Sequence, residues 1–434
     1  MKVSQHSMKR GKQMSEKVVL AYSGGLDTTV AVRWLKQTQD LDVVALLVDV
    51  GQGGDTELLR KRAMESGALD AQVVDAREEY ANEYVTRALA ANALYQDRYP
   101  LVSALSRPLI CRHLADAAHH YGARYVAHGC TGKGNDQVRF EVSLGALSPD
   151  LQILAPCRGW GMTRDQAIGY AMQHNLPISQ APSSPYSIDE NLWGRAIECG
   201  VLEDPFVEPP EDIWERTLRG PGSPVEPTYL EVTFHHGLPV ELDGDPVGFA
   251  ELVAVVDKLA GSYGIGRIDM IEDRVVGIKS REVYECPAAM TLIEAHAELE
   301  HLTLDRDLLR TKRDLERVYA NLAYEGLWFS PLREALDAFI QTTQQYVNGV
   351  VRLKLSPGEL RVVGRKSAAS LYETSLATYD RDDAFDHKAA EGFVKLWGLP
   401  LRTCARARRA DAESPPGAGS WEGVAEALRQ PDEG

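Results

Sequence analysis

The first 180 residues of this chain alternate between short β-branched runs and longer segments with helical spacing, and this alternation constrains the fold most strongly. The strand-like runs fall at 17–22, 43–48, 71–74, 125–127 and 153–155, and the helical segments at 28–38, 56–67, 78–94, 109–121 and 163–175. Such alternation is typical of βαβ units, whose parallel sheet is covered by helices on both faces. The sequence therefore predicts an α/β fold with a doubly wound parallel sheet.

The pattern changes after a connector rich in proline and serine at 175–187, so we expect a second domain of α+β character. Its strands are predicted near 229–234, 275–278, 349–355 and 359–363, and its helices near 246–263, 291–302, 330–347 and 383–396. A length of 434 residues also favours two domains. We expect a disordered leader at 1–16, a first domain at 17–182, a second at 183–403 and a flexible tail at 404–434.

Charge and cysteine content argue against several classes of partner. The formal net charge is −16, whereas binding to a nucleic-acid backbone needs basic surface, so we expect no nucleic-acid partner. No apolar run approaches the roughly 20 residues of a membrane span, and the basic N-terminus lacks an apolar signal segment. The six cysteines are scattered without Cys-x-x-Cys spacing, which disfavours a zinc site or a disulfide framework and fits a reducing cytoplasm.

The first predicted strand ends in Ser23-Gly24-Gly25, directly before a predicted helix. Ligands of an open parallel sheet bind beyond the carboxyl ends of its strands. Two glycines let the backbone approach a ligand closely, and the N–H groups of the turn and of the helix N-terminus favour an anion. The hydroxyls of Ser23, Thr28 and Thr29 add donors, and Asp27 can orient a metal.

A plain strand-to-helix turn, with Asp27 or Thr28 as N-cap, explains the two glycines nearly as well. Neither the G-x-x-x-x-G-K-[ST] nor the G-x-G-x-x-G phosphate signature is present at this position. The segment does match S-G-G-x-D-[ST], which resembles the pyrophosphate loop of the N-type ATP pyrophosphatases.

A second polar loop, "AHGCTGKGNDQVRFE" at 127–141, begins where another predicted strand ends, so it should lie on the same rim of the sheet. Its glycines permit close backbone approach, and Thr131, Asn135 and Asp136 offer donors and an acceptor suited to the carboxylate and ammonium of an amino acid. Arg139 can bind a carboxylate or a phosphate through two parallel hydrogen bonds. The alternative is a Gly/Asn/Asp-rich loop that only reverses the chain direction and binds no ligand.

These segments, taken with several downstream ones, resemble the argininosuccinate synthases over about residues 16–403. The matching stretches are "AYSGGLDTT", "DVGQG", "RPLI", "HGCTGKGNDQVRFE", "PYSIDENLWGRAIECGVLEDP", "GIGRIDMIEDRVVGIKSREVYE" and "VVGRKSAASLY", in the family's order. The resemblance implies a nucleotide-binding domain of the adenine nucleotide alpha hydrolase-like fold at 17–182. It also implies a synthetase and multimerisation domain at 183–403, a C-terminal helix, a homotetramer in the cytoplasm, and ATP with Mg²⁺.

The resemblance also implies a role for individual residues. ATP would be bound by Ala21, Tyr22, Ser23, Gly24, Gly25, Leu26, Asp27, Thr28, Thr29, Val48 and Gly129. L-Aspartate would be bound by Thr131, Asn135 and Asp136, and L-citrulline by Tyr99, Ala104, Asn135, Arg139, Ser187, Ala196, Glu272 and Tyr284. No covalent catalyst is expected; Asp27, Arg107, Lys133, Asp136 and Arg139 would position the reactants. Lys279 and Arg281 are further candidates for a local positive field. A surface ion pair is the alternative for any of these cations, Arg107 and Arg281 included, and the metal ligands stay open.

Two positions depart from the family's usual pattern. Serines of the citrulline pocket are replaced by Ala104 and Ala196, and each lost hydroxyl could forfeit about 0.5–1.5 kcal/mol of binding. Val48 also stands where a smaller alanine is common. The main hypothesis is therefore ATP-dependent ligation of citrulline and aspartate, and the alternative is a paralogous ligase that joins aspartate to a different ureido or carbamoyl compound. A different class of ATP pyrophosphatase and an inactive scaffold are the remaining alternatives.

Overall fold

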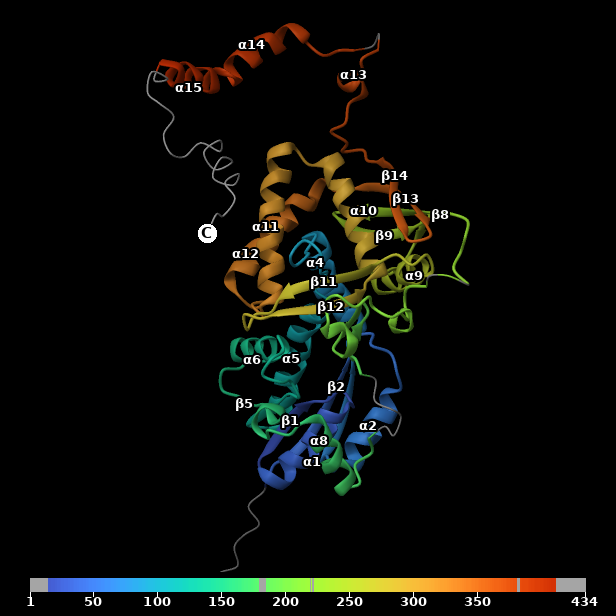
Figure 1. The fold of residues 1–434 in the computed structure, drawn as a ribbon, viewed down its shortest axis with the longest axis vertical. Helices are drawn as coiled ribbons and strands as arrows, with labels where there is room; N and C mark the ends of the chain where they lie inside the picture. Colours follow the sequence, from blue (N-terminus) through green and yellow to red (C-terminus); the bar gives the residue numbers. More distant parts are fainter. Residues whose placement is uncertain (1–14, 179–184, 219, 221, 381–382, 411–434) are drawn as a thin grey trace, which may run out of the picture. The chain divides into compact units, whose positions relative to one another are not determined.

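The computed structural model describes residues 15–178, 185–218, 220, 222–380 and 383–410. These residues form two compact units, one ending at Leu371 and one beginning at Tyr372 (Figure 1). Residues 1–14 of the leader expected at 1–16, and residues 411–434 of the tail expected at 404–434, lie outside the described residues. The predicted domain boundary at 182/183 also lies outside them and stays a prediction.

A five-stranded parallel sheet of order β3-β2-β1-β4-β5 confirms the predicted α/β fold. Its strands are β1 (Lys17–Ala21), β2 (Asp42–Asp49), β3 (Asp70–Asp75), β4 (Tyr125–Ala127) and β5 (Gln152–Leu154). Alternate residues of the central strands enter two different cores: Val18 and Leu20 pack with α1 (Leu26–Thr38) and α2 (Thr56–Glu65), whereas Val19 packs with α5 (Val102–Tyr121). The sheet is therefore covered on both faces, as a doubly wound sheet must be.

Two helix predictions and one loop prediction in this part need correction. The segment predicted as one helix at 78–94 consists of α3 (Arg77–Tyr80), the π-helical segment η1 (Ala81–Val85) and α4 (Thr86–Ala90). The helix predicted from 109 begins seven residues earlier, at Val102, and passes through Pro108. The second polar loop is shorter than expected, because α6 (Asp136–Leu147) starts inside it. The part is completed by α7 (Pro156–Gly159) and α8 (Arg164–Gln173).

Two antiparallel sheets follow within the same compact unit. One has the order β11-β12-β7-β6 and comprises β6 (Ser187–Asn191), β7 (Gly194–Glu198), β11 (Arg267–Asp273) and β12 (Lys279–Glu285). The other has the order β10-β9-β8-β13-β14, with β8 (Thr228–His235), β9 (Leu238–Leu242), β10 (Asp245–Pro246), β13 (Gly349–Ser356) and β14 (Glu359–Lys366). The helices are α9 (Phe249–Ser262), α10 (Pro287–Thr303), α11 (Arg306–Tyr324) and α12 (Pro331–Thr343), and short 3₁₀ turns η2, η3 and η4 lie at Gly200–Glu203, Glu211–Ile213 and Gln344–Tyr346.

The strand predicted at 275–278 is wrong, because these residues form the turn of the hairpin between β11 and β12. The apolar run "VVGI" marks the turn, while β11 mixes charged with apolar residues, β12 begins with the polar residues Lys-Ser-Arg-Glu, and neither strand was predicted. The hairpin of β6 and β7, the strands β9 and β10, and the helix α11 were also not predicted. The other predicted strands and helices of this part correspond to β8, β13, β14, α9, α10 and α12.

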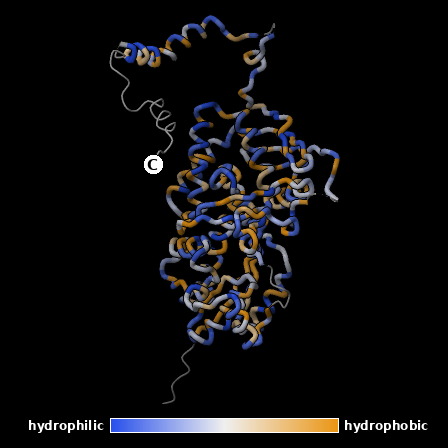
Figure 2. The backbone as a smooth tube through the Cα atoms, viewed as in Figure 1, coloured by the Kyte–Doolittle hydropathy of each residue, from blue (hydrophilic) through white to orange (hydrophobic). Residues whose placement is uncertain are grey.

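The second compact unit consists of α13 (Thr374–Ala377), α14 (His387–Trp397) and α15 (Leu399–Ala410). Because α15 runs to Ala410, the residues 404–410 are helical and the expected tail does not begin at 404. Hydrophilic and hydrophobic segments both occur along these helices (Figure 2), and the large apolar side chains Phe393, Leu396 and Trp397 are exposed. Among the described residues, no helix is long and apolar enough to cross a membrane.

Candidate functional site

The glycine turn after β1 opens directly onto the N-terminus of α1. Gly24 has a φ of +77°, a conformation that suits glycine. Gly25 is the N-cap of α1, and no side chain caps this helix end. The alternative of a turn capped by Asp27 or Thr28 is therefore not what the structure shows. The uncapped N–H groups of the first helical turn and its positive dipole end give this turn the character of an anion site.

The second polar loop approaches this turn because β4 pairs with β1 in parallel, with Ala127 opposite Leu20. Gly129 lies so close to α1 that a Cβ on it would stand 2.8 Å from Cγ2 of Thr28. Thr28 is in turn held by Ser23, whose hydroxyl lies 3.2 Å from the Thr28 hydroxyl. The predicted common rim is thus formed by backbone packing, and glycine is the residue that permits the contact.

Two adjoining cavities open at this rim. The first, of about 340 Å³, is lined by the turn after β1 and by the ends of β1 and β2. The second, of about 370 Å³, lies between the second loop, α5, α6 and the sheet that contains β11 and β12. The cavities share the residues Ser23, Asp27, Arg107, Gly129, Cys130, Asp136 and Asp189. The two cavities therefore adjoin, and the shared residues would contact a molecule in either cavity.

The residues expected to bind ATP gather at the first cavity. It is lined by Ala21, Tyr22, Ser23, Gly25, Leu26, Asp27, Thr28, Val48 and Gly129. Gly24 and Thr29 are not part of its wall; Thr29 is buried, with its hydroxyl 3.1 Å from the phenol oxygen of Tyr22. Burial raises the pKa of Asp27, an effect that nearby Arg164 opposes.

The residues expected to bind the two amino acids gather at the second cavity, with one exception. Its wall contains Thr131, Asn135 and Asp136, together with Tyr99, Arg139, Ser187, Ala196, Glu272 and Tyr284. Ala104, on α5, is buried and lines neither cavity, so only Ala196 of the two departing positions lines the second cavity.

Asp136 joins the two arginines of the site. Arg107 donates to Oδ2 of Asp136 at 2.7 Å and to Asp189 at 2.6 Å, and Arg139 donates to Oδ1 of Asp136 at 2.9 Å. Burial opposes the ionisation of Asp136, but Arg107 and then Arg139 outweigh it and lower its pKa to about 2. Both arginines are therefore already engaged with acidic groups.

The structure does not provide the local excess of positive charge that the sequence led us to expect. Arg107, Arg139 and Arg274 are the Lys or Arg side chains among the described residues that line the second cavity, where six acidic side chains face them. Lys133 is exposed and lines neither cavity. Lys279 and Arg281 also lie outside both walls, paired with Asp273 and Asp269. An anion at this rim would consequently depend on backbone N–H groups more than on side-chain cations.

Several residues of the second cavity were not predicted: Asp189, Glu198, Arg274 and Glu282. Arg274, at the turn of the β11–β12 hairpin, donates to Glu198 and Glu282 and to the backbone oxygen of Lys133. The hairpin is thereby fastened to the second polar loop. A sequence signal existed, because all four lie in stretches that carry the family resemblance, but nothing in those stretches indicates which charged residue meets which.

A shared proton is implied at the phenol of Tyr284. Its oxygen lies 2.8 Å from carboxylate oxygens of both Glu272 and Glu282. A phenol has one proton, so it can donate to one carboxylate, and the other must carry a proton to keep its hydrogen bond. Burial and then the charge of Glu272 raise the pKa of Glu282 to about 7, which makes Glu282 the protonated partner below about pH 7. The pKa of Glu198 is also raised, to about 6, by burial and by Glu282.

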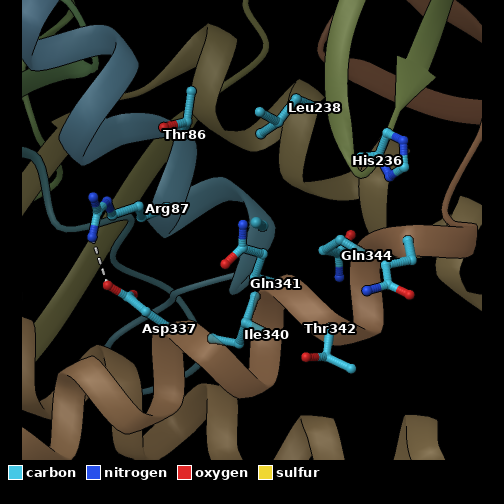
Figure 3. A pocket seen from close by; sticks show the side chains of 11 residues that line it. Thr86, Arg87, His236, Leu238, Asp337, Ile340, Gln341, Thr342 and Gln344 are labelled. Carbon is cyan, nitrogen blue, oxygen red and sulfur yellow. Dashed lines mark hydrogen bonds and ion pairs between the residues drawn. The ribbon is translucent and has the colours of Figure 1, made fainter.

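A larger cavity, of about 690 Å³, lies elsewhere in the same compact unit, between α4, β9 and α12 (Figure 3). It is lined by Thr86, Arg87, Asp337 and Gln344 among others, with an ion pair of 2.7 Å between Arg87 and Asp337. None of the residues predicted for binding or catalysis lines it. Volume alone therefore does not identify the candidate site.

Comparison with known proteins agrees with this geometry. The family model described as "Arginosuccinate synthase N-terminal HUP domain" matches residues 17–177, and "Arginosuccinate synthase C-terminal domain" matches residues 186–404. An argininosuccinate synthase of Brevibacillus brevis is 56% identical over 90% of this chain and 93% of its own length. Those of Gloeobacter violaceus and Trichodesmium erythraeum are each 55% identical, over 91% and 89% of this chain and 100% and 97% of their own lengths.

The raised pKa of Glu282 leads to a prediction about stability. Between about pH 4.5 and about pH 7, Glu282 keeps its proton in the folded chain but has lost it in the unfolded chain, where its pKa is that of an ordinary glutamate. The free energy of unfolding therefore falls as pH rises through this window. We expect Glu282→Gln to gain stability relative to the native chain as pH rises through this window, with a constant difference above it. Urea unfolding at a series of pH values measures the difference, and Glu57→Gln, at an exposed glutamate, is the control. A difference that does not change with pH would contradict the assignment.

Proposed function

The chain belongs to the argininosuccinate synthase family, and from this membership we propose how its two adjoining cavities carry out an AMP-forming ligation. The enzyme joins L-citrulline to L-aspartate at the expense of ATP and forms argininosuccinate, AMP and pyrophosphate, as in arginine biosynthesis. The observation that carries the proposal is the common wall of the cavities, formed in part by Ser23, Asp27, Gly129 and Asp136. Because these residues face both cavities, a nucleotide in one cavity can come into contact with an amino acid in the other.

The reaction proceeds in two displacements. The ureido oxygen of citrulline attacks the α-phosphate of ATP, and pyrophosphate leaves, which gives a citrullyl-adenylate. The amino group of aspartate, after losing a proton, then attacks the ureido carbon and expels AMP. No side chain becomes covalently modified, so the rate gain comes from holding the reactants in line, which can lower a barrier by about 7–11 kcal/mol.

The first cavity binds ATP in this proposal. The N–H groups at the start of α1, with the hydroxyls of Ser23 and Thr28, receive the phosphates. Val48 and Gly129 contact the nucleotide from the neighbouring strands. Mg²⁺ enters with the phosphates: the described residues hold no cluster of three or more His, Cys, Asp or Glu suited to a metal, and Mg²⁺ commonly needs only one or two carboxylates beside phosphate oxygens. Asp27 and Asp189, which line both cavities, are the carboxylates that fit this role.

The second cavity binds the two amino acids. Thr131, Asn135 and Asp136 receive aspartate, with the Asp136 carboxylate beside its amino group. Citrulline lies deeper, among Tyr99, Arg139, Ser187, Ala196, Glu272 and Tyr284, with Asn135 between the two substrates. Asp27, Arg107, Asp136 and Arg139 orient the reacting groups, whereas Lys133, outside both walls, would have to move to take part.

The alternative substrate, a ureido compound other than citrulline, gains no support from the comparisons. The relatives that share more than half of their residues with this chain over nearly their full lengths are named argininosuccinate synthase. The structure also weakens the original motive for the alternative, since Ala104 lines neither cavity.

A homotetramer in the cytoplasm is part of the proposal, and both features follow from the family. The second compact unit supports assembly alone, because the apolar side chains of α14 and α15 are largely exposed; Trp397 is 71% exposed and Leu401 77%. Phe393 and Trp397 stack with their ring centroids 5.6 Å apart, one helical turn from each other. An apolar helix face of this kind is typical of a surface that is covered in an assembly.

AMP formation with a panel of ureido acids tests the substrate. We expect rapid AMP and pyrophosphate release with ATP, L-aspartate and L-citrulline, and much slower release with N-carbamoyl compounds of other chain lengths. The pocket residues are placed for one length of amino acid, so a mismatch of one methylene should cost about tenfold to 200-fold in kcat/KM. Turnover of another ureido acid with citrulline inert would overturn the proposal.

Asp136→Ala separates the two displacements. Removal of the carboxylate that receives the amino group of aspartate should abolish argininosuccinate formation, while citrulline-dependent exchange of pyrophosphate into ATP stays measurable. The exchange and the full reaction are assayed side by side, with Asp273→Ala, outside both cavities, as the control. An undiminished yield of argininosuccinate would contradict the assigned aspartate site.

The double substitution Phe393→Ser and Trp397→Ser tests the assembly. Loss of the apolar face of α14 should lower the molecular mass measured by light scattering below that of a tetramer. Lys388→Ser, a change at a charged residue of the same helix, should leave the mass unchanged. An unaltered tetramer in the double variant would show that this face does not hold the assembly.

A further inference from the structure

Tyr324, the last residue of α11, contacts three residues of the second cavity and was not predicted from sequence. Its hydroxyl accepts a hydrogen bond from Nδ2 of Asn135 at 2.8 Å and donates one to Oε1 of Glu272 at 2.6 Å. Its backbone oxygen accepts from Nε of Arg139 at 2.9 Å. A single residue thus connects the second polar loop, α6 and β11.

The ring of Tyr324 is also held by contacts with its neighbours. It stacks on Tyr95 with centroids 3.5 Å apart, and the guanidinium of Arg139 lies 4.9 Å from its centroid. The chain after it is also close-packed, because a Cβ on Gly326 would stand 2.8 Å from Cα of Arg139. The phenol is buried, and Tyr324 belongs to the wall of neither cavity, so it acts through the residues that it holds.

The contact with Asn135 sets the orientation of that amide. Oδ1 of Asn135 accepts from the backbone N–H of Val275 at 2.9 Å, and Nδ2 donates to Tyr324. Rotating the amide by a half-turn would set two donors against each other at Val275. One N–H and one lone pair of the amide are left over, and these are the groups that substrates can use.

The contact with Glu272 keeps a buried carboxylate in place. Glu272 is 1% exposed, and both of its oxygens receive phenol protons, Oε2 from Tyr284 and Oε1 from Tyr324. Without the hydroxyl of Tyr324, one oxygen of this carboxylate would lose its donor while remaining buried. Hydrogen bonds to charged groups are worth more than neutral ones, so the side chain of Glu272 would move toward another donor.

We propose that Tyr324 is a positioning residue that fixes the aspartate site at Asn135 relative to the citrulline site at Glu272. The proposal rests on the proposed function, because it concerns the same two amino acids. It adds that the spacing of their sites is set by a residue that touches neither of them. ATP, bound on the far side of the common wall, does not depend on it.

Tyr324→Phe tests this proposal, because it removes the hydroxyl and keeps the ring stacking and the backbone contact with Arg139. We expect kcat/KM for citrulline and for aspartate to fall by about tenfold to a hundredfold, with the KM for ATP within about twofold of the native value. Tyr95→Phe is the matched control: it removes the neighbouring phenol, which donates to the backbone oxygen of Asp273, and should leave all three constants near native values.

The possible outcomes separate cleanly. Native-like constants in Tyr324→Phe overturn the proposal. An equal rise in the KM values of all three substrates overturns it too, because it would mark a general structural role. A loss for only one of the amino acids overturns the proposed link between their sites. If Tyr324→Phe is unstable, thermal unfolding with saturating ligands decides: we expect a smaller stabilisation by citrulline and an unchanged one by ATP. Lack of citrulline-dependent activity in the native enzyme would instead refute the proposed function.

Discussion

The arrangement of the site depends on the parallel pairing of β1 and β4. Parallel neighbours deliver their carboxyl ends to the same edge, so the loop after Ala21 and the loop after Ala127 emerge side by side. Gly129 then makes the contact with Thr28 possible, since a Cβ at this position would stand 2.8 Å from Cγ2 of Thr28. The two cavities can adjoin because the second loop packs this closely against the first turn of α1.

The charges of the site impose a second constraint. The protein is acidic overall, and its second cavity is acidic too. The proposed substrate ATP, a nucleoside triphosphate, is nevertheless strongly anionic. Arg107 and Arg139 are neutralised by Asp136 and Asp189, and buried ion pairs of this kind contribute little net stability because desolvation offsets their attraction. Their effect is geometric: they hold α5 and α6 in register beside the rim. In the proposed function, phosphate recognition is left to the N-terminus of α1, whose uncapped N–H groups and dipole do not depend on side-chain cations.

The local parts of this arrangement could be predicted from sequence, and the distant contacts could not. Glycines and hydroxyls at the ends of β-branched runs are local signals, and they located the turn at Ser23 and the loop at Thr131 correctly. The partners of Asn135 lie 189 and 140 residues away, at Tyr324 and Val275, and no periodicity reveals them. The same limit applies to Arg281, a candidate for the local positive field whose guanidinium instead pairs with Asp269, as its ion-pair alternative has it.

The chemical identity of residue 135 follows from the direction of the hydrogen bonds that pass through it. The N–H of Val275 donates to Asn135, the amide of Asn135 donates to Tyr324, and the phenol of Tyr324 donates to Glu272. Every donor in this chain points toward the buried carboxylate, and each bond polarises the next in the same sense. An aspartate at 135 would present only acceptors, so the proton of Tyr324 would be drawn toward it and away from Glu272. An amide is therefore the group that can accept from the hairpin, donate toward Glu272 and still keep one donor and one acceptor for the substrates.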